Sequence, residues 1–126
     1  MLERFSKSYR LNDKEKFVKK LINFSVDQEY FILLNSNNNS DKYDLLCGYG
    51  VKSFIKSSEN SLTKLDNFFK LKKDWLFGYM TYGLRNEIEV LNDNNIDFIN
   101  MPNLYFFQPK IVWFVKGKNV TGLSFE

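Results

Sequence analysis

Apolar residues recur along the chain with two different spacings, which predict helices in some segments and strands in others. Residues 13–24 carry apolar side chains at helical intervals behind Asn12 and Glu15, which have the spacing of a capping box. Ser61 can cap a second helix, whose apolar stripe repeats every three or four residues. A third, short helix is predicted over residues 84–91. The chain therefore has two predicted helices and a short third one.

Short apolar runs bounded by polar or turn-forming residues predict the strands. The first, residues 30–34, is continuous enough to be buried on both sides. Residues 43–55 include Gly48 and Gly50, which predicts one bent strand or two paired ones. Further strands are predicted over residues 75–82, 104–107, 111–115 and 120–125. We expect an α+β fold, with a mainly antiparallel sheet formed from sequential hairpins and no parallel βαβ order.

The size of the chain limits how many domains it can form. Its 126 residues fit one compact unit, so residues 1–126 are predicted to be a single domain. Hydrophobic residues make up 44% of the chain, enough to build a core. Because the chain stops inside its last predicted hairpin, we expect it to be truncated from a longer protein. The same reasoning predicts an exposed apolar strand face over residues 105–107 and 111–114.

The charge pattern gives little sign of a charged partner. Eighteen basic and 15 acidic residues leave a net charge of +3. Lysines form short doublets separated by acids, whereas nucleic-acid binders usually gather them on one face, so nucleic acid is not the expected partner. The first ten residues lack the apolar core of a signal peptide, and no apolar run is long enough to span a bilayer. We expect a cytoplasmic protein without a membrane partner.

The absence of certain residue types excludes several kinds of catalytic site. The chain has no His, which rules out His-dependent triads and most catalytic zinc sites. Cys47, the only cysteine, lies in an apolar run and is predicted to be a buried, inert thiol. Glu87 and Glu89 stand two apart on a predicted helix, so they point in different directions and cannot share a metal ion. We therefore predict no catalytic residue and no metal site in this chain.

Two segments together carry a resemblance to a known family. The first reads Trp-Leu-Phe-Gly-Tyr-Met-Thr-Tyr-Gly-Leu-Arg-Asn-Glu-Ile-Glu over residues 75–89, and it resembles the N-terminal part of component I of aminodeoxychorismate and anthranilate synthases. Gly83 departs from the family pattern, which usually has Asp there. Matching residues are Gly78, Tyr79, Tyr82, Leu84, Arg85, Glu87 or Glu89, and the later Pro102 with Leu-Tyr-Phe-Phe-Gln-Pro109.

The second segment is Phe-Ile-Leu-Leu-Asn-Ser over residues 31–36, followed by Tyr-Asp-Leu-Leu-Cys-Gly over residues 43–48. In the family such a segment lines a pocket for tryptophan, so the resemblance implies that Ser36, Lys42 and Tyr43 line one here. A surface loop whose polar residues only satisfy turns is the alternative. Asn35 stands where anthranilate synthases typically carry Glu, which favours the aminodeoxychorismate branch.

The resemblance implies a non-catalytic N-terminal domain of aminodeoxychorismate synthase component I, an enzyme of para-aminobenzoate and folate biosynthesis. In the family, the catalytic His, the magnesium-binding glutamates and a Lys that attacks the ring lie in the chorismate-binding domain further along the chain. The implied partners are therefore this missing domain, the glutamine amidotransferase subunit of the parent enzyme, and L-tryptophan. This chain alone is predicted to be inactive and to hold no cofactor, while the parent is expected to use magnesium.

Two other functions stay open from the sequence. One is the corresponding domain of anthranilate synthase component I, in tryptophan biosynthesis. The other is a free-standing module that binds single-stranded nucleic acid through exposed aromatic side chains beside Lys110 and Lys116. Burial of the aromatic side chains separates this module from a scaffold domain. The side chains concerned are Tyr79, Tyr82, Tyr105, Phe106 and Phe107.

Overall fold

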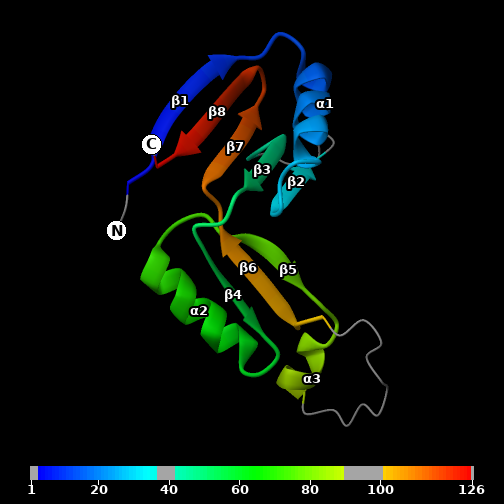
Figure 1. Cartoon of the computed structure of the whole chain (residues 1–126), viewed down its shortest axis with the longest axis vertical. Helices are drawn as coiled ribbons and strands as arrows, with labels where there is room; N and C mark the ends of the chain where they lie inside the picture. The colour runs from blue at the N-terminus through cyan, green and yellow to red at the C-terminus, as the bar shows by residue number, and fades with distance from the viewer. Residues whose placement is uncertain (1–2, 37–41, 90–100, 126) are drawn as a thin grey trace. The chain divides into compact units, whose positions relative to one another are not determined.

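A computed structural model describes residues 3–36, 42–89 and 101–125, without the side chains of residues 88 and 89. Within these ranges the chain forms three helices and eight strands, and all strand pairings are antiparallel (Figure 1). The predicted α+β fold with antiparallel strands, two helices and a short third one is confirmed. The elements are β1 (Phe5–Arg10), α1 (Lys14–Ser25), β2 (Phe31–Asn35), β3 (Leu45–Tyr49), β4 (Ser53–Ser57), α2 (Ser61–Lys72), β5 (Phe77–Met80), α3 (Leu84–Glu89), β6 (Leu104–Gln108), β7 (Ile111–Lys116) and β8 (Asn119–Ser124).

The chain divides into two compact units. Unit 1 comprises residues 1–51 and 109–126, and unit 2 comprises residues 52–108. Unit 1 holds a five-stranded sheet in the order β1-β8-β7-β3-β2, with helix α1. Unit 2 holds a three-stranded sheet in the order β4-β6-β5, with helices α2 and α3. The chain thus leaves unit 1 after β3 and re-enters it at β7.

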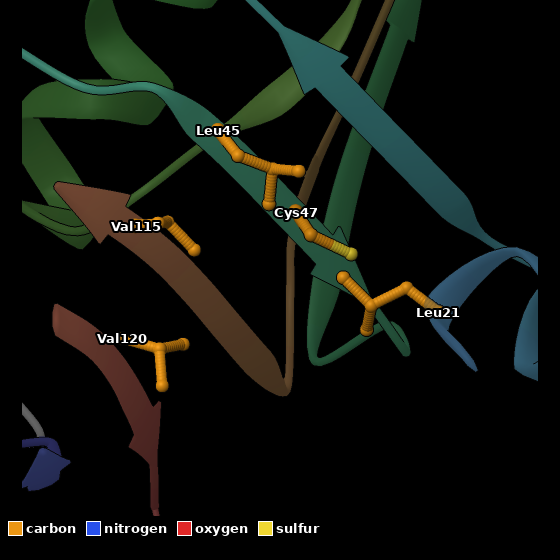
Figure 2. Close-up of a cluster of buried hydrophobic side chains, with 5 residues drawn as sticks. All are labelled: Leu21, Leu45, Cys47, Val115 and Val120. Atoms are coloured by element: carbon orange, nitrogen blue, oxygen red, sulfur yellow. The ribbon is translucent and has the colours of Figure 1, made fainter. Parts of the chain in front are cut away.

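The core of unit 1 lies between α1 and one face of the five-stranded sheet. Leu21 of α1 packs with Leu45, Cys47, Val115 and Val120, which come from β3, β7 and β8 (Figure 2). Leu45 is paired directly with Val115, and Val115 with Val120, so these side chains share one face of the sheet. Burial of this apolar cluster removes its side chains from water and so stabilises the unit.

An aromatic group extends this core along the same face. Trp113 donates a hydrogen bond from Nε1 to the hydroxyl oxygen of Tyr49 at 3.1 Å. The ring of Phe31 lies nearly parallel to that of Tyr49, with ring centroids 6.0 Å apart. A Cβ atom at Gly122 would come within 2.6 Å of the Trp113 ring, so the indole occupies the space that a side chain would need. The Trp113 ring therefore requires glycine at position 122.

The two faces of the unit 2 sheet differ in which of their residues are exposed. Along β4, Ile55 and Ser57 are more buried than Phe54 and Lys56, which point the other way. Helix α2 packs against β4 (Figure 1), and the burial of Ile55 and Ser57 indicates that it covers their face. Leu104, which is paired with Ser57 on that face, is fully buried. The opposite face carries exposed Phe54 and Lys56 on β4 but also buried Phe107 and Phe77 on β6 and β5.

Several predicted elements are confirmed, but their connections differ from the prediction. Helix α1 begins one residue later than expected, and its N-cap is Asp13, whose carboxylate accepts a hydrogen bond from the Lys16 amide, rather than Asn12. Only β2–β3 and β7–β8 are hairpins among the described strands, so the predicted series of sequential hairpins is wrong. The segment predicted as one bent strand or two paired ones, residues 43–55, holds β3 and the start of β4, but these two strands belong to different sheets and do not pair.

Two predictions about exposure are also wrong. The strand expected to be buried on both sides is β2, an edge strand, and its Leu34 is 53% exposed. The apolar face expected over residues 105–107 and 111–114 is not exposed as a whole, because Phe107 and Val112 are buried.

Strand β1 was not predicted at all, and it pairs with β8 at the other edge of the sheet. A polar strand at an edge has no apolar alternation to reveal it.

Candidate functional site

The candidate tryptophan residues lie at one end of the β2–β3 hairpin. Ser36 follows the last residue pair of the hairpin and faces Asp44. The Ser36 amide and the Ser36 hydroxyl both donate to the Asp44 carbonyl oxygen, at 3.0 and 3.1 Å. The hydroxyl hydrogen is therefore used within the fold, while the lone pairs of Oγ can still accept a hydrogen bond from a ligand.

Tyr43 and Lys42 lie on the other side of residues 37–41, which are outside the described ranges. The Tyr43 ring meets the Phe114 ring edge-on, with centroids 5.3 Å apart, and is partly buried. Lys42 is exposed. The Asp44 carboxylate is tied to the neighbouring β7–β8 turn, where its Oδ2 accepts a hydrogen bond from the Gly117 amide at 2.8 Å. The structure thus brings Ser36 and Tyr43 to the same end of the sheet, and whether they bind an amino acid stays a prediction.

Gly78 lies where two backbones come into close contact. It is paired with Phe106, and a Cβ atom added to it would lie 2.0 Å from the Tyr105 carbonyl oxygen and 2.6 Å from the Phe106 Cα atom. Both of those atoms belong to the β6 backbone and cannot move without disturbing the sheet. Glycine at position 78 is therefore required by the β5–β6 pairing.

Glu87 connects three segments of unit 2. Its Oε1 accepts a hydrogen bond from the Ser61 amide at 2.9 Å, and its Oε2 accepts from the Ser61 hydroxyl and from Asn103 Nδ2, both at 2.8 Å. Desolvation raises the pKa of Glu87, but the hydrogen bonds from Ser61 and Asn103, together with the charge of Lys64, outweigh it and lower that pKa overall. The carboxylate is therefore held ionised as a structural acceptor.

The other family-motif residues of the first matching segment, Tyr79, Tyr82, Arg85 and Glu89, differ in how exposed their side chains are. Tyr79 is partly buried and lies nearly parallel to Tyr105, with ring centroids 6.0 Å apart. Tyr82 is 97% exposed and Arg85 is also exposed. Glu89 ends helix α3, and its side chain lies outside the description. These residues are not gathered into one site within the described part of the unit.

The face of the three-stranded sheet that carries Phe54 and Lys56 also carries a row of nearly parallel aromatic rings. Phe54 and Tyr105 have ring centroids 5.7 Å apart with an angle of 7° between their planes, and Tyr105 and Tyr79 continue the row at 6.0 Å and 17°. Phe54 is 49% exposed at the edge of this row. Lys56 is exposed and pairs directly with Tyr105, so it lies on the same face. Phe77 and Phe107 lie on the same face and are buried, so the face is exposed mainly at Phe54 and Lys56.

Two polar networks of unit 2 were not anticipated from the sequence. Ser61 was expected only as a helix cap, yet it is almost fully buried and bound to Glu87 from a distant helix. Buried Gln108 donates from Nε2 to Asp74 and accepts from the Ser53 hydroxyl, both at 2.8 Å. The partners are 26 or more residues apart in each case, so no local spacing could have identified them.

Cys47 behaves as the sequence predicted. It is fully buried, and desolvation by burial raises the pKa of its thiol to about 12. The thiol is therefore protonated at neutral pH and is a poor nucleophile.

The described residues hold neither a candidate metal-binding group nor a helix that could span a membrane. Over residues 3–36, 42–89 and 101–125, no three His, Cys, Asp or Glu side chains gather into a group that could hold a metal ion. Among the helices described, none is long and apolar enough to cross a membrane. In comparisons with known proteins, no family model matches the chain, and no curated protein matches it either.

Proposed function

We propose that this chain is a non-catalytic N-terminal segment of a chorismate-utilising synthase, of the aminodeoxychorismate synthase component I type, and that it serves as a scaffold for the catalytic domain. The observation that carries the proposal concerns residues 75–89 and 102–109, which together form the first stretch that resembles the family. They form adjacent strands in one small sheet, where β5 pairs with β6. Stretches that are separated along the chain are thus parts of one structural unit.

Two of the matching residues within these stretches, Gly78 and Glu87, have roles in folding. Gly78 allows β5 to approach the β6 backbone, where a Cβ atom would collide with Tyr105. Glu87 holds the first residue of α2 and the segment before β6 through Ser61 and Asn103. A domain whose motif residues maintain the fold fits a scaffold role better than a catalytic one, because catalytic residues must reach a substrate.

The tryptophan pocket is part of this proposal. Ser36 offers a hydroxyl oxygen, Tyr43 an aromatic ring and Lys42 an ammonium group, and the first two lie at the same end of the five-stranded sheet. An amino acid there would place its ammonium group near the Ser36 oxygen and its carboxylate near Lys42. In this proposal the catalytic domain completes the pocket, so the chain alone binds tryptophan weakly.

The test begins with the gene. The coding sequence that adjoins this segment is read for a chorismate-binding domain, and the protein it encodes is purified with and without the segment. Formation of aminodeoxychorismate is then measured from chorismate, magnesium and ammonia. We expect turnover by the whole protein, none by the 126-residue chain, and reduced turnover or stability for the protein that lacks the segment.

Product identity separates the two synthase branches. Aminodeoxychorismate as the product supports the proposal, whereas anthranilate assigns the chain to the anthranilate synthase branch. Turnover by the purified chain alone, above a blank without protein, contradicts the scaffold role. An adjoining gene without any chorismate-binding domain contradicts the family assignment.

Binding of single-stranded nucleic acid is less well supported by the aromatic side chains of unit 2. Phe107 is buried, and Tyr79 and Tyr105 stack on each other rather than presenting isolated ring faces. Tyr82 is the exception, since it is almost fully exposed. Lys110 and Lys116 belong to unit 1, whereas these aromatic residues belong to unit 2. Packing within the sheet accounts for the stacked rings without a ligand.

A further inference from the structure

Strand β2 forms one edge of the five-stranded sheet, and its outer side pairs with no strand in the described part of the chain. Its sequence, Phe-Ile-Leu-Leu-Asn, contains no charged residue, glycine or proline. Natural sheets usually protect an exposed edge with charges, with proline or by keeping the strand very short. The other edge strands follow this rule, since β1 carries Lys7 and Arg10, β4 carries Lys56, and β5 has only 4 residues. Among the described strands, β2 is therefore the unprotected edge.

The hydrogen bonds between β2 and β3 show which backbone groups of β2 point outward. At one end of this ladder, the Ser36 amide donates to the carbonyl oxygen of Asp44, its direct partner. Because hydrogen-bonded pairs alternate along antiparallel strands, the even-numbered residues of β2 bond to β3. The N–H and C=O groups of Phe31 and Leu33 therefore point toward the outer edge, where they can pair with another strand.

Apolar side chains flank this edge on both faces of the sheet. On the face opposite the core of unit 1, Leu34 is 53% exposed and Ile32 is half-buried. On the core face, Phe24 of α1 lies against the ring of Tyr49, the partner of Phe31, and is still 43% exposed. A backbone edge bordered by apolar side chains is the kind of surface that binds an added β-strand.

The edge is complementary to itself. When two copies pair antiparallel about a two-fold axis at Ile32, Phe31 of one copy lies opposite Leu33 of the other. Each such pair exchanges two backbone hydrogen bonds, so the outward groups of both residues are satisfied. Ile32 then meets its own equivalent, and Leu34 packs beside Tyr30 on the same face. Since β2 has no charged residue, no like charges meet along the paired strands.

We propose that this chain forms a symmetric dimer in which the β2 strands of two copies pair and join their five-stranded sheets into one continuous sheet. A second copy is the occupant because it supplies outward backbone groups with the same spacing and uncharged, apolar side chains on both faces. Main-chain hydrogen bonds contribute affinity, and the apolar side chains set the register. The inference is independent of the proposed function, because it uses only the β2 edge.

Sedimentation equilibrium of the purified chain at increasing concentration tests the dimer. We expect the wild type to shift from monomer to dimer. Ile32→Lys and Ile32→Glu each place like charges directly opposite one another across the axis, so either substitution should weaken dimerisation about tenfold or more. An equal mixture of these two variants should dimerise again, because opposite charges then meet. Leu71→Lys, at a position of α2 that is 75% exposed, is the control and should dimerise like the wild type.

Ile32→Cys gives a second test with a smaller change to the surface. Position 32 forms a pair without hydrogen bonds in the proposed dimer, so its two Cα atoms lie about 4.5 Å apart, close enough for a disulfide. Mild oxidation should therefore link two copies of this variant. Leu71→Cys adds an exposed thiol away from β2 and should link far more slowly. The native Cys47 is buried and does not interfere.

Three results would each overturn the dimer and leave the proposed function standing. The first is a wild type that stays monomeric at all concentrations. The second is a pair of charged variants that dimerise as well as the wild type, or whose mixture stays monomeric although circular dichroism shows that both fold. The third is Ile32→Cys chains that link no faster than Leu71→Cys chains, a comparison that remains decisive where the charged variants do not fold.

Discussion

Glu87 in α3 binds both the backbone amide and the hydroxyl of Ser61, the first residue of α2, at 2.9 and 2.8 Å. The residue before the helix, Asn60, has a left-handed backbone and no side-chain capping bond. The free amides at a helix start need acceptors, and a negative charge there is favourable because of the helix dipole. A carboxylate from another helix thus replaces the usual local cap of α2.

We expect Glu87→Gln to lower the free energy of unfolding by about 1–2 kcal/mol. Glutamine keeps one acceptor oxygen, but its NH₂ group faces the donors of Ser61 or Asn103, which then lose their charged partner. Urea unfolding followed by circular dichroism measures the change. Glu29→Gln makes the same substitution at an exposed site and should leave stability unchanged. Equal effects of the two substitutions would show that the Glu87 contacts contribute nothing specific.

The lowered pKa of Glu87 predicts a dependence of stability on pH. Because the folded pKa lies below the ordinary value of 4.5, the carboxylate stabilises the fold above pH 4.5, and this contribution is lost as the pH falls through the folded pKa. The stability difference between wild type and Glu87→Gln should therefore be largest near neutral pH and shrink in acid. Urea unfolding at pH 7, 5, 4 and 3 measures it. A difference that stays constant across this series would argue against the assignment.

Gly78 and Gly117 predict contrasting effects of the same substitution. An alanine Cβ at Gly78 would collide with the β6 backbone, so Gly78→Ala should destabilise the chain by about 3 kcal/mol or more. Gly117 has open space around it but a φ of +60°, so Gly117→Ala should cost only about 1–2 kcal/mol, from backbone strain. Chemical denaturation of the two variants compares them. Similar losses would mean that crowding at Gly78 is relieved by small shifts in the sheet.

The sequence was informative where contacts are local. The spacing of Phe17 and Leu21 identified α1, and the apolar run around Trp113 identified β7, because each reflects burial of one element against its neighbours. It did not reveal β1, whose residues are all exposed and whose partner β8 lies at the far end of the chain. Nor could it divide the strands between two sheets, since the β3–β7 and β4–β6 pairings join distant segments.

The same limit applies to the candidate site. Gly78 and Glu87 were identified by resemblance to a family, but only the structure explains the requirement for glycine at one and for a carboxylate at the other. The row of aromatic rings on the three-stranded sheet was also hidden, because Phe54, Tyr79 and Tyr105 come from three separate segments. Side-chain partners that folding brings together leave no fixed spacing in the sequence.

Burial of Cys47 predicts a thiol protected from reagents. With a pKa of about 12 and no exposed surface, it should not react with a disulfide reagent at pH 8 in the folded chain, and should react fully in concentrated urea. Leu34→Cys on the exposed part of β2 provides a control thiol that should react without denaturant. Rapid labelling of Cys47 under native conditions would indicate that unit 1 opens frequently.

Ser36→Ala separates a structural role of the hydroxyl from a role in binding. The Ser36 hydroxyl donates to the Asp44 carbonyl, which also accepts from the Ser36 amide, so the backbone contact survives the substitution. We therefore expect a stability loss of about 1 kcal/mol or less in urea unfolding of the chain.

If Ser36 also contacts the ammonium group of tryptophan, the substitution should weaken tryptophan binding by the whole protein about fivefold or more, measured by calorimetry. Thr121→Ala, which removes a hydroxyl bonded to Ser8 on the same sheet, is the control and should leave tryptophan binding unchanged. If Ser36→Ala leaves tryptophan binding unchanged, the hydroxyl acts only within the hairpin. Loss of a ligand contact would lower the affinity for tryptophan, whereas loss of the contact to Asp44 lowers only stability.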